Sequence, residues 1–164
     1  MTFVRRDFEH ALRVRYGECD PQGIVFNANY LLYFDVAFTE LWRAALGPWQ
    51  ALKDAGVDLV VANASIDFRA SARFDDELIL LARVARLGTT SITTELDVQR
   101  EGELLVAGRL VHVCVDANDL SKTELPDWVR AGLRPYANGD TESGAGGSSG
   151  GDSHAGRAPA GGSS

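Results

Sequence analysis

The residues of this chain that are best suited to chemistry lie in a short turn ahead of a long apolar segment. The turn reads Glu-Cys-Asp-Pro-Gln-Gly over residues 18–23, and Asn27 follows where the apolar segment begins. A helix that starts near Asn27 leaves backbone N–H groups unpaired at its N-terminus, where negative charge is favoured. Asp20 therefore supplies a candidate nucleophile or general base beside a candidate oxyanion site. Acyl transfer needs that combination.

The same residues also have ordinary structural interpretations, and the sequence alone leaves both open. An aspartate before a proline is common in turns, and an asparagine at a helix start is a common N-cap. Gly23 either lets the backbone approach a substrate closely or only serves the turn. Cys19 has no histidine nearby in the sequence to activate it, which favours a packing role. Glu18 is interpreted as a solvated or supporting acid.

The first elements expected from the pattern are a strand at 9–16 and a helix that begins near 27–30. Gly47 and Pro48 give the helix a clear stop. Apolar residues of this helix recur at three- and four-residue spacings and spread widely around its axis, as in a helix buried on most sides. Residues 49–55 are expected to form a short helical or irregular link.

The rest of the chain is expected to be mostly strand. Alternating or apolar patterns predict four strands, at 57–69, 77–87, 91–100 and 104–116, with a tight turn at Glu101-Gly102. A short helix is expected at 125–133, with Pro126 near its start. An antiparallel sheet wrapped on one buried helix buries both apolar surfaces, so the sequence predicts an α+β fold.

Composition limits the other possibilities. The 164 residues are 45% hydrophobic and predict one folded domain, at 1–137. Residues 138–164 are almost entirely small and polar and predict a disordered Gly/Ser-rich tail. The net charge of −7 argues against nucleic acid or an anionic membrane as partner. With two cysteines, no apolar segment long enough for a membrane and no signal-like N-terminus, a cytoplasmic location is expected.

The turn and the helix resemble a known family. The segment Asp-Pro-Gln-Gly-Ile-Val-Phe at 20–26, followed by Asn29-Tyr30 and by a helix with Phe34, Asp35 and Glu40, is similar to the 4-hydroxybenzoyl-CoA thioesterase family of hotdog-fold enzymes. Residues 63–80 and 108–116 also resemble strands of that family. The resemblance covers about residues 8–133.

The resemblance implies an acyl-CoA thioesterase in which an antiparallel sheet wraps a central helix. It implies dimers joined sheet edge to sheet edge, often paired into tetramers, with active sites at the dimer interface and no metal or redox cofactor. Asp20 aligns with the family's catalytic carboxylate, which either attacks the thioester or activates water. The backbone N–H of Asn27 would hold the oxyanion, with Gly23 allowing close approach. Many relatives carry an aromatic residue or histidine at position 27, so no role is inferred for the Asn27 side chain.

Basic residues near turns are candidates for binding the phosphates of CoA. Arg69 and Arg73 flank one turn, and Arg86 precedes a polar turn at 88–91. The substrate-binding candidates are therefore Arg69, Arg73, Arg86, Thr89, Thr90 and Ser91. The alternative for each arginine is a solvated surface residue.

The remaining ionisable residues are expected to be structural. His112 lies in an apolar strand, His10 is expected to precede the first strand as an exposed residue, and the histidines and cysteines have no metal-ligand spacing. Asp35 and Glu40 are interpreted as structural or interface acids, although another hotdog subgroup uses a carboxylate on the helix.

Two other functions stay open from the sequence. A hydratase or dehydratase on the same fold pairs a histidine with a carboxylate, and no histidine lies near the helix start. A non-catalytic acyl-binding or scaffold protein would keep the core pattern without needing Asp20. For the thioesterase itself, the acyl group is undecided between aromatic and short or medium aliphatic, and acyl carrier protein is less suited than CoA because both proteins would be acidic.

Overall fold

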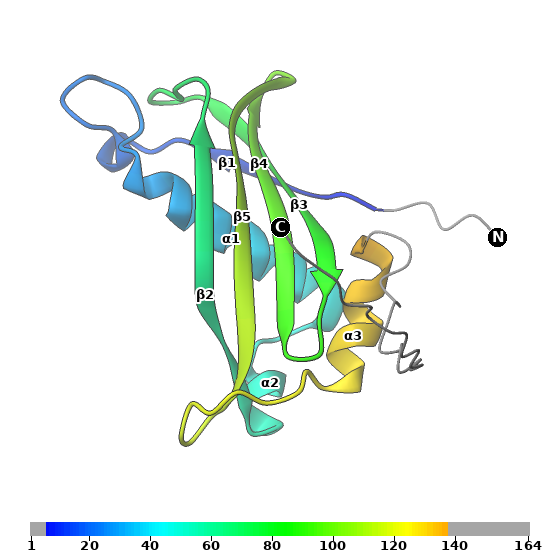
Figure 1. The fold of residues 1–164 in the computed structure, drawn as a ribbon. Coiled ribbons are helices and arrows are strands. Elements are labelled where there is room, and N and C mark those ends of the chain that lie inside the picture. The colour runs from blue at the N-terminus through cyan, green and yellow to red at the C-terminus, as the bar shows by residue number, and fades with distance from the viewer. Residues whose placement is uncertain (1–5, 138–164) are drawn as a thin grey trace, which may run out of the picture.

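A computed structural model describes residues 6–137 and shows one antiparallel sheet curved around a long helix (Figure 1). The sheet has the strand order β1-β3-β4-β5-β2, and every neighbouring pair is antiparallel. The strands are β1 (Phe8–Arg13), β2 (Val57–Phe68), β3 (Glu77–Leu87), β4 (Ser91–Arg100) and β5 (Glu103–Asp116). The helices are α1 (Ala28–Leu46), α2 (Gln50–Asp54) and α3 (Asp127–Leu133), with 3₁₀ turns η1 (Tyr16–Glu18) and η2 (Arg134–Tyr136).

The helix α1 supplies much of the core. Its buried residues are Tyr30, Tyr33, Phe34, Ala37, Phe38, Leu41 and Trp42, at the three- and four-residue spacings that place side chains on one face. They pack on alternate residues of the strands, such as Ile92, Thr94, Leu96 and Val98 of β4, which are all fully buried. Gly47 ends α1 with a φ of 82°, a left-handed conformation that favours glycine.

The expected elements are confirmed with local differences. The first strand ends at Arg13 rather than at residue 16, because the chain then bends into η1, where the side chain of Glu18 caps the backbone of Arg15. The expectation that α1 is buried on most sides is wrong at its first turns, since Leu31 and Leu32 are 43% and 48% exposed. The expected tail at 138–164 lies outside the described residues.

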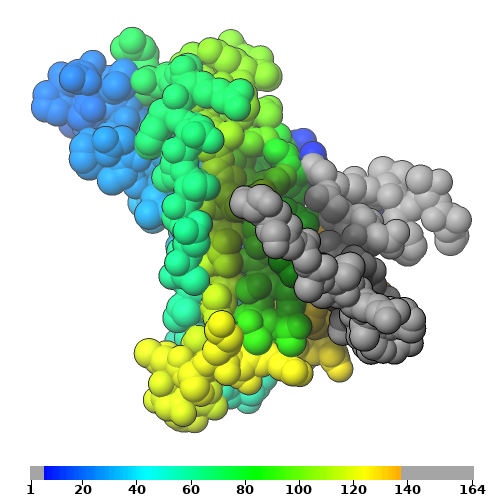
Figure 2. Space-filling model, viewed as in Figure 1, coloured from blue at the N-terminus to red at the C-terminus, as the bar shows by residue number. Residues whose placement is uncertain are grey.

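The strand β2 forms one edge of the sheet. Only β5 pairs with it among the described strands, and much of its length is exposed, including Val60, Val61 and Phe68. Figure 2 shows its residues running along the visible face of the molecule. A long edge strand with apolar side chains is a ready template for pairing with another strand. No helix in the described part of the chain is long and apolar enough to span a membrane.

Candidate active site

The turn that carries Asp20 is a small closed loop between η1 and α1. The N–H of Asp20 donates to the carbonyl of Ile24 at 2.9 Å, and the N–H of Gly23 donates back to the carbonyl of Asp20 at 2.9 Å. Gly23 has a φ of 78°, so the turn requires a residue that tolerates this conformation. Asp20 Oδ1 accepts the N–H of Gln22 at 2.8 Å. The other carboxylate oxygen, Oδ2, accepts no hydrogen bond from any described residue and is available for chemistry.

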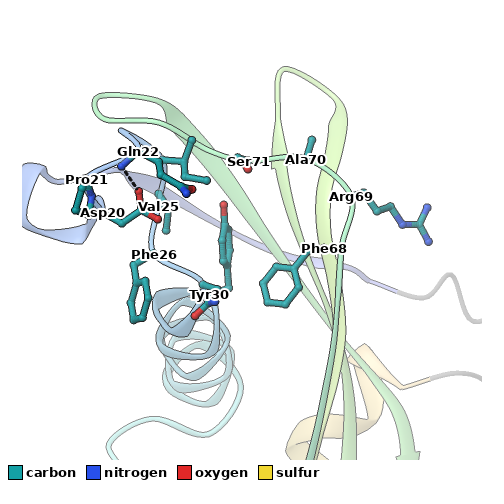
Figure 3. A pocket seen from close by; sticks show the side chains of 12 residues that line it. Asp20, Pro21, Gln22, Val25, Phe26, Tyr30, Phe68, Arg69, Ala70 and Ser71 are labelled. Atoms are coloured by element: carbon teal, nitrogen blue, oxygen red, sulfur yellow. Dashed lines mark hydrogen bonds between the residues drawn. The ribbon is translucent and has the colours of Figure 1, made fainter.

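Asp20 lies in a pocket of about 680 Å³ (Figure 3). The loop supplies one side of this pocket, the first turn of α1 supplies the floor, and the end of β2 with the segment after it supplies the other side. The lining residues are Asp20, Pro21, Gln22, Ile24, Val25, Phe26, Asn27, Tyr30, Phe68, Arg69, Ala70 and Ser71. The rings of Tyr30 and Phe68 meet edge to face, with centroids 5.7 Å apart. The pocket thus combines one carboxylate with an aromatic wall, an arrangement suited to a ligand with an apolar part.

The N-terminus of α1 opens into the same pocket. Asn27 stands at the N-cap position and is exposed, but its side chain makes no capping hydrogen bond, so the interpretation of Asn27 as a side-chain N-cap is wrong. Within residues 6–137, the N–H groups of Asn27 and Ala28 donate no hydrogen bond. Unpaired N–H groups at the start of a 19-residue helix favour an anion or a developing oxyanion.

Glu18 is buried beneath the loop and is only 8% exposed. Its Oε2 accepts the hydroxyl of Tyr33 and the backbone N–H of Arg15, both at 2.8 Å, and its Oε1 accepts the guanidinium of Arg15. Burial by itself raises the pKa of this carboxyl, but the hydrogen bonds from Arg15 and Tyr33 outweigh burial and hold the pKa below its ordinary value. Of the two interpretations of Glu18, the solvated acid is wrong, and the structure places it as a support of the loop.

The segment after β2, which forms the far wall of the pocket opposite the Asp20 loop, is held by hydrogen bonds from residues outside the pocket. The guanidinium of Arg100 donates to the carbonyl of Ser71 at 3.3 Å and to Asp76 Oδ2 at 2.8 Å. Asp76 also accepts the backbone N–H of Arg73 at 2.8 Å. Burial raises the pKa of the Asp76 carboxyl, and these donors lower it further than burial raises it. The segment after β2 is therefore fixed relative to the sheet.

The residues expected to bind CoA do not all gather here. Arg69 lies at the pocket, but its guanidinium extends away from Asp20 (Figure 3). Arg73 follows in the same segment, where its backbone pairs with Ile24, and it does not line the pocket.

The polar turn at 88–91 lies at the opposite end of the sheet (Figure 1). The carbonyl of Thr90 accepts the N–H of Cys114, so the turn lies beside one end of β5. The N–H of Arg69 donates to the carbonyl of Leu105, so the pocket segment lies beside the other end. Along β5 the nine positions from Leu105 to Cys114 span about 30 Å. One chain therefore does not bring Arg86, Thr89, Thr90 and Ser91 to Asp20.

The histidines of the described chain stay out of the pocket. His112 lies within β5 as expected, is 3% exposed, and stacks on the ring of Phe38 with centroids 3.9 Å apart. Burial lowers the pKa of His112 to about 4. His10 is inside β1 and half-buried, so the expectation of an exposed residue ahead of the strand is wrong.

Other candidate side chains also lie outside the pocket lining. Asp35 is exposed on α1, Glu40 pairs with Arg43 on the same helix, and Cys19 is half-buried beside the loop. The described residues contain no group of three or more His, Cys, Asp or Glu side chains that could hold a metal ion.

The sequence interpretation missed the aromatic wall, which consists of Phe26, Tyr30 and Phe68. Tyr30 had a usable signal, because it follows Asn27 by three positions and so lies on the first helical turn. Phe68 had none, because its approach to α1 depends on where the end of β2 lies in the folded sheet.

Comparison with known proteins gives consistent matches. The family model described as Thioesterase superfamily matches residues 22–107, just over half of the 164-residue chain. The acyl-CoA thioester hydrolase YbgC of Escherichia coli O6:H1 is 32% identical over 125 residues, which cover 76% of this chain and 93% of the relative. The 1,4-dihydroxy-2-naphthoyl-CoA hydrolase of Nostoc punctiforme is 31% identical over 126 residues, which cover 74% of this chain and 83% of the relative. A solved structure of a thioesterase superfamily protein from Jannaschia sp. CCS1 superposes with a TM-score of 0.77 at 26% identity and covers 84% of this chain and 98% of its own.

Proposed function

Because the chain belongs to the thioesterase superfamily and is a thioester hydrolase with the hotdog fold, we propose that it cleaves an acyl-CoA with Asp20 as the catalytic carboxylate. The observation that carries the proposal is the shared pocket. Asp20, which has a carboxylate oxygen with no hydrogen bond from the described chain, and Asn27, whose N–H is unpaired among the described residues, line the same pocket. The narrower 4-hydroxybenzoyl-CoA branch stays a prediction from the sequence.

The proposed reaction consumes one water and yields a free acid and the CoA thiol. Asp20 either attacks the thioester carbonyl carbon, giving an acyl anhydride that water then opens, or takes a proton from water as the water attacks. In both routes the carbonyl oxygen becomes negative in the tetrahedral intermediate, and the N–H groups at the start of α1 stabilise it. The C–S bond then breaks, and the thiolate leaves with the electron pair and takes up a proton.

The proposed active site is completed by a second copy of the chain. The pocket lies at the Phe68 end of the exposed strand β2. If two β2 strands pair antiparallel about a twofold axis, the Phe68 end of one lies beside the Val57 end of the other. Ser91 and Val60 both align with Val113 of β5, so the turn at 88–91 lies at the Val57 end.

This pairing would bring the polar turn of the second copy toward the pocket of the first. The turn carries the expected phosphate-binding group of Arg86, Thr89, Thr90 and Ser91, while Arg69 and Arg73 belong to the pocket end of the same copy as Asp20. The proposal thereby explains why residues about 30 Å apart along one chain could serve one CoA molecule. Dimers of this kind are the minimum active unit that we propose, and a tetramer would be a pair of them.

The pocket is suited to an acyl group that is either an aromatic ring or an aliphatic chain. Phe26, Tyr30 and Phe68 provide apolar contact next to Asp20. The relatives named above act on acyl-CoA and on 1,4-dihydroxy-2-naphthoyl-CoA, and both classes belong in the test. A hydratase is not favoured, because the pocket lining formed by the described residues includes no histidine.

The experiment is thiol release from a panel of aromatic and aliphatic acyl-CoAs by the wild type and by Asp20→Asn. Turnover of a panel member by the wild type, with most of that rate lost in the variant, is the expected result. Retained rate in Asp20→Asn would remove Asp20 from the mechanism. An inactive wild type that still binds acyl-CoA would favour a non-catalytic acyl-binding protein.

A further inference from the structure

We propose that Glu18 is a positioning residue that fixes the Asp20 carboxylate relative to the N-terminus of α1. This inference rests on the proposed function, because it gives Glu18 a role in the same hydrolysis. Neither Glu18 nor its partners Arg15, Asn29 and Tyr33 line the pocket. Glu18 therefore acts through the loop and not on the substrate.

The backbone of Glu18 closes the base of the loop. Its carbonyl oxygen accepts the N–H of Phe26 at 2.9 Å and the side-chain amide of Asn29 at 2.8 Å. Glu18 precedes Asp20 by two positions, and Phe26 directly precedes Asn27. These two hydrogen bonds therefore join the chain just before the carboxylate to the chain just before the candidate oxyanion donor.

The side chain of Glu18 supplies a second attachment to the same helix. Tyr33, which is fully buried in α1, donates its hydroxyl to Oε2 at 2.8 Å, and it lies one turn beyond Asn29. Arg15 donates its backbone N–H to Oε2 and its guanidinium to Oε1. These hydrogen bonds hold the segment just before the loop to the same carboxylate. Two attachments one turn apart fix the orientation of the loop on α1, whereas a single attachment would let it pivot.

A glutamine at position 18 is a selective probe of this arrangement. It keeps the volume of glutamate but replaces one acceptor oxygen with an NH₂ group that cannot accept from Arg15 or Tyr33. The core packing is retained while one attachment of the loop is lost. Because a misplacement of about 1 Å can cost about 100-fold in rate, turnover should respond more strongly than folding does.

The test measures kcat and KM with an acyl-CoA for Glu18→Gln, Tyr33→Phe and the double variant. We expect kcat of Glu18→Gln to fall between about 10- and 100-fold with KM little changed. Both changes act on the hydrogen bond between position 18 and Tyr33, which a neutral glutamine weakens and phenylalanine removes, so the double variant should lose less than the product of the two single losses. The matched control is Glu40→Gln, which removes an ion pair with Arg43 on the same helix away from the pocket and should keep wild-type kcat.

A second measurement does not depend on activity. Backbone amide NMR spectra of folded Glu18→Gln should show shifts concentrated at residues 19–28, with the sheet residues unchanged. Wild-type kcat in folded Glu18→Gln, a loss explained by the unfolded fraction in its melting curve, or unchanged amides at 19–28 would overturn the positioning role. If the wild type releases no thiol from any acyl-CoA, the proposed function fails, and the amide shifts alone then decide whether Glu18 positions the loop.

Discussion

The hydroxyl of Tyr30 accepts a hydrogen bond from the backbone N–H of Ala72 at 3.0 Å. Tyr30 lies in the first turn of α1 and is 2% exposed, while Ala72 belongs to the segment after β2 and is fully buried. The contact joins two sides of the pocket, because the residues just before Ala72 form its far wall. The wall that faces Asp20 is thus held by the same helix whose N-terminus offers the oxyanion site.

Tyr30→Phe should therefore weaken both the fold and the site. The change leaves the N–H of Ala72 buried without an acceptor, which costs about 1–2 kcal/mol in the free energy of unfolding. KM for acyl-CoA should rise because the wall segment is less fixed. Denaturant unfolding and steady-state kinetics measure the two effects. Tyr16→Phe is the control, since Tyr16 is 82% exposed and its loss of a hydroxyl should change stability by less than about 0.5 kcal/mol.

Gly108 is expected to be intolerant of any side chain. A Cβ at this position in β5 would lie 2.2 Å from Cε2 of Phe34 and 2.6 Å from the carbonyl oxygen of Ser65. A packed ring and a backbone atom cannot both move aside, so Gly108→Ala should cost about 3 kcal/mol in the free energy of unfolding. Chemical denaturation of the purified variant measures this loss.

Gly132→Ala provides the matched comparison. Its Cβ would meet Cδ2 of Leu46 at 2.1 Å, but that atom is the end of a flexible side chain, and the nearest backbone atom, the carbonyl oxygen of Ala45, is 3.2 Å away. Alanine also has a better helix propensity than glycine in α3. The net change should be under about 1 kcal/mol, and an equal loss in the two variants would contradict the packing argument for Gly108.

The sequence was sufficient for most of the fold because its signals are local. The α1 boundary follows from the stop at Gly47-Pro48, and the turn at Glu101-Gly102 follows from Gly102, since glycine tolerates the positive φ that both residues of the turn adopt. The loop around Asp20 was found for the same reason, since a carboxylate ahead of a helix start is visible as a short motif.

The parts of the site that the sequence did not supply depend on tertiary contacts. The buried side chain of Glu18 accepts a hydrogen bond from Tyr33, which is 15 positions away. Phe68 reaches the pocket only because β2 ends there, and the turn at 88–91 lies far from Asp20 because β3 runs away from the pocket before the turn and β4 runs back toward it. Spacing along the chain carries no information about these distances.

His112 should make stability sensitive to mild acid. Burial lowers the pKa of His112 from 6.5 to about 4, so the unfolded chain binds this proton at a higher pH than the folded chain does. Stability is therefore complete above about pH 6.5 and falls as the pH drops toward 4, by up to about 3 kcal/mol from this residue. Urea unfolding at a series of pH values measures the slope.

The variant His112→Leu should flatten that slope between pH 6.5 and 4, because it removes the group that protonates on unfolding. Thr94→Val is the control, since Thr94 is also fully buried with an unpaired hydroxyl among the described residues but does not titrate. It should keep the wild-type slope whatever its effect at pH 7. A wild-type slope in His112→Leu would show that other groups, such as Glu18, dominate the response to acid.

The edge strand β2 should be sensitive to charge if it pairs with a second copy. Val61 lies in the middle of β2 and is 51% exposed, and an aspartate there would place two charges near each other across an antiparallel pair. Val61→Asp should therefore give a smaller species in size-exclusion chromatography with light scattering, and thiol release should fall with it because the second copy completes the proposed site. The control is Leu120→Asp, since Leu120 is 64% exposed in the loop after β5 and is expected to leave assembly and rate unchanged. A Val61→Asp protein that keeps the wild-type assembly mass and activity would exclude β2 as the interface. It would also mean that the second copy does not complete the site across β2.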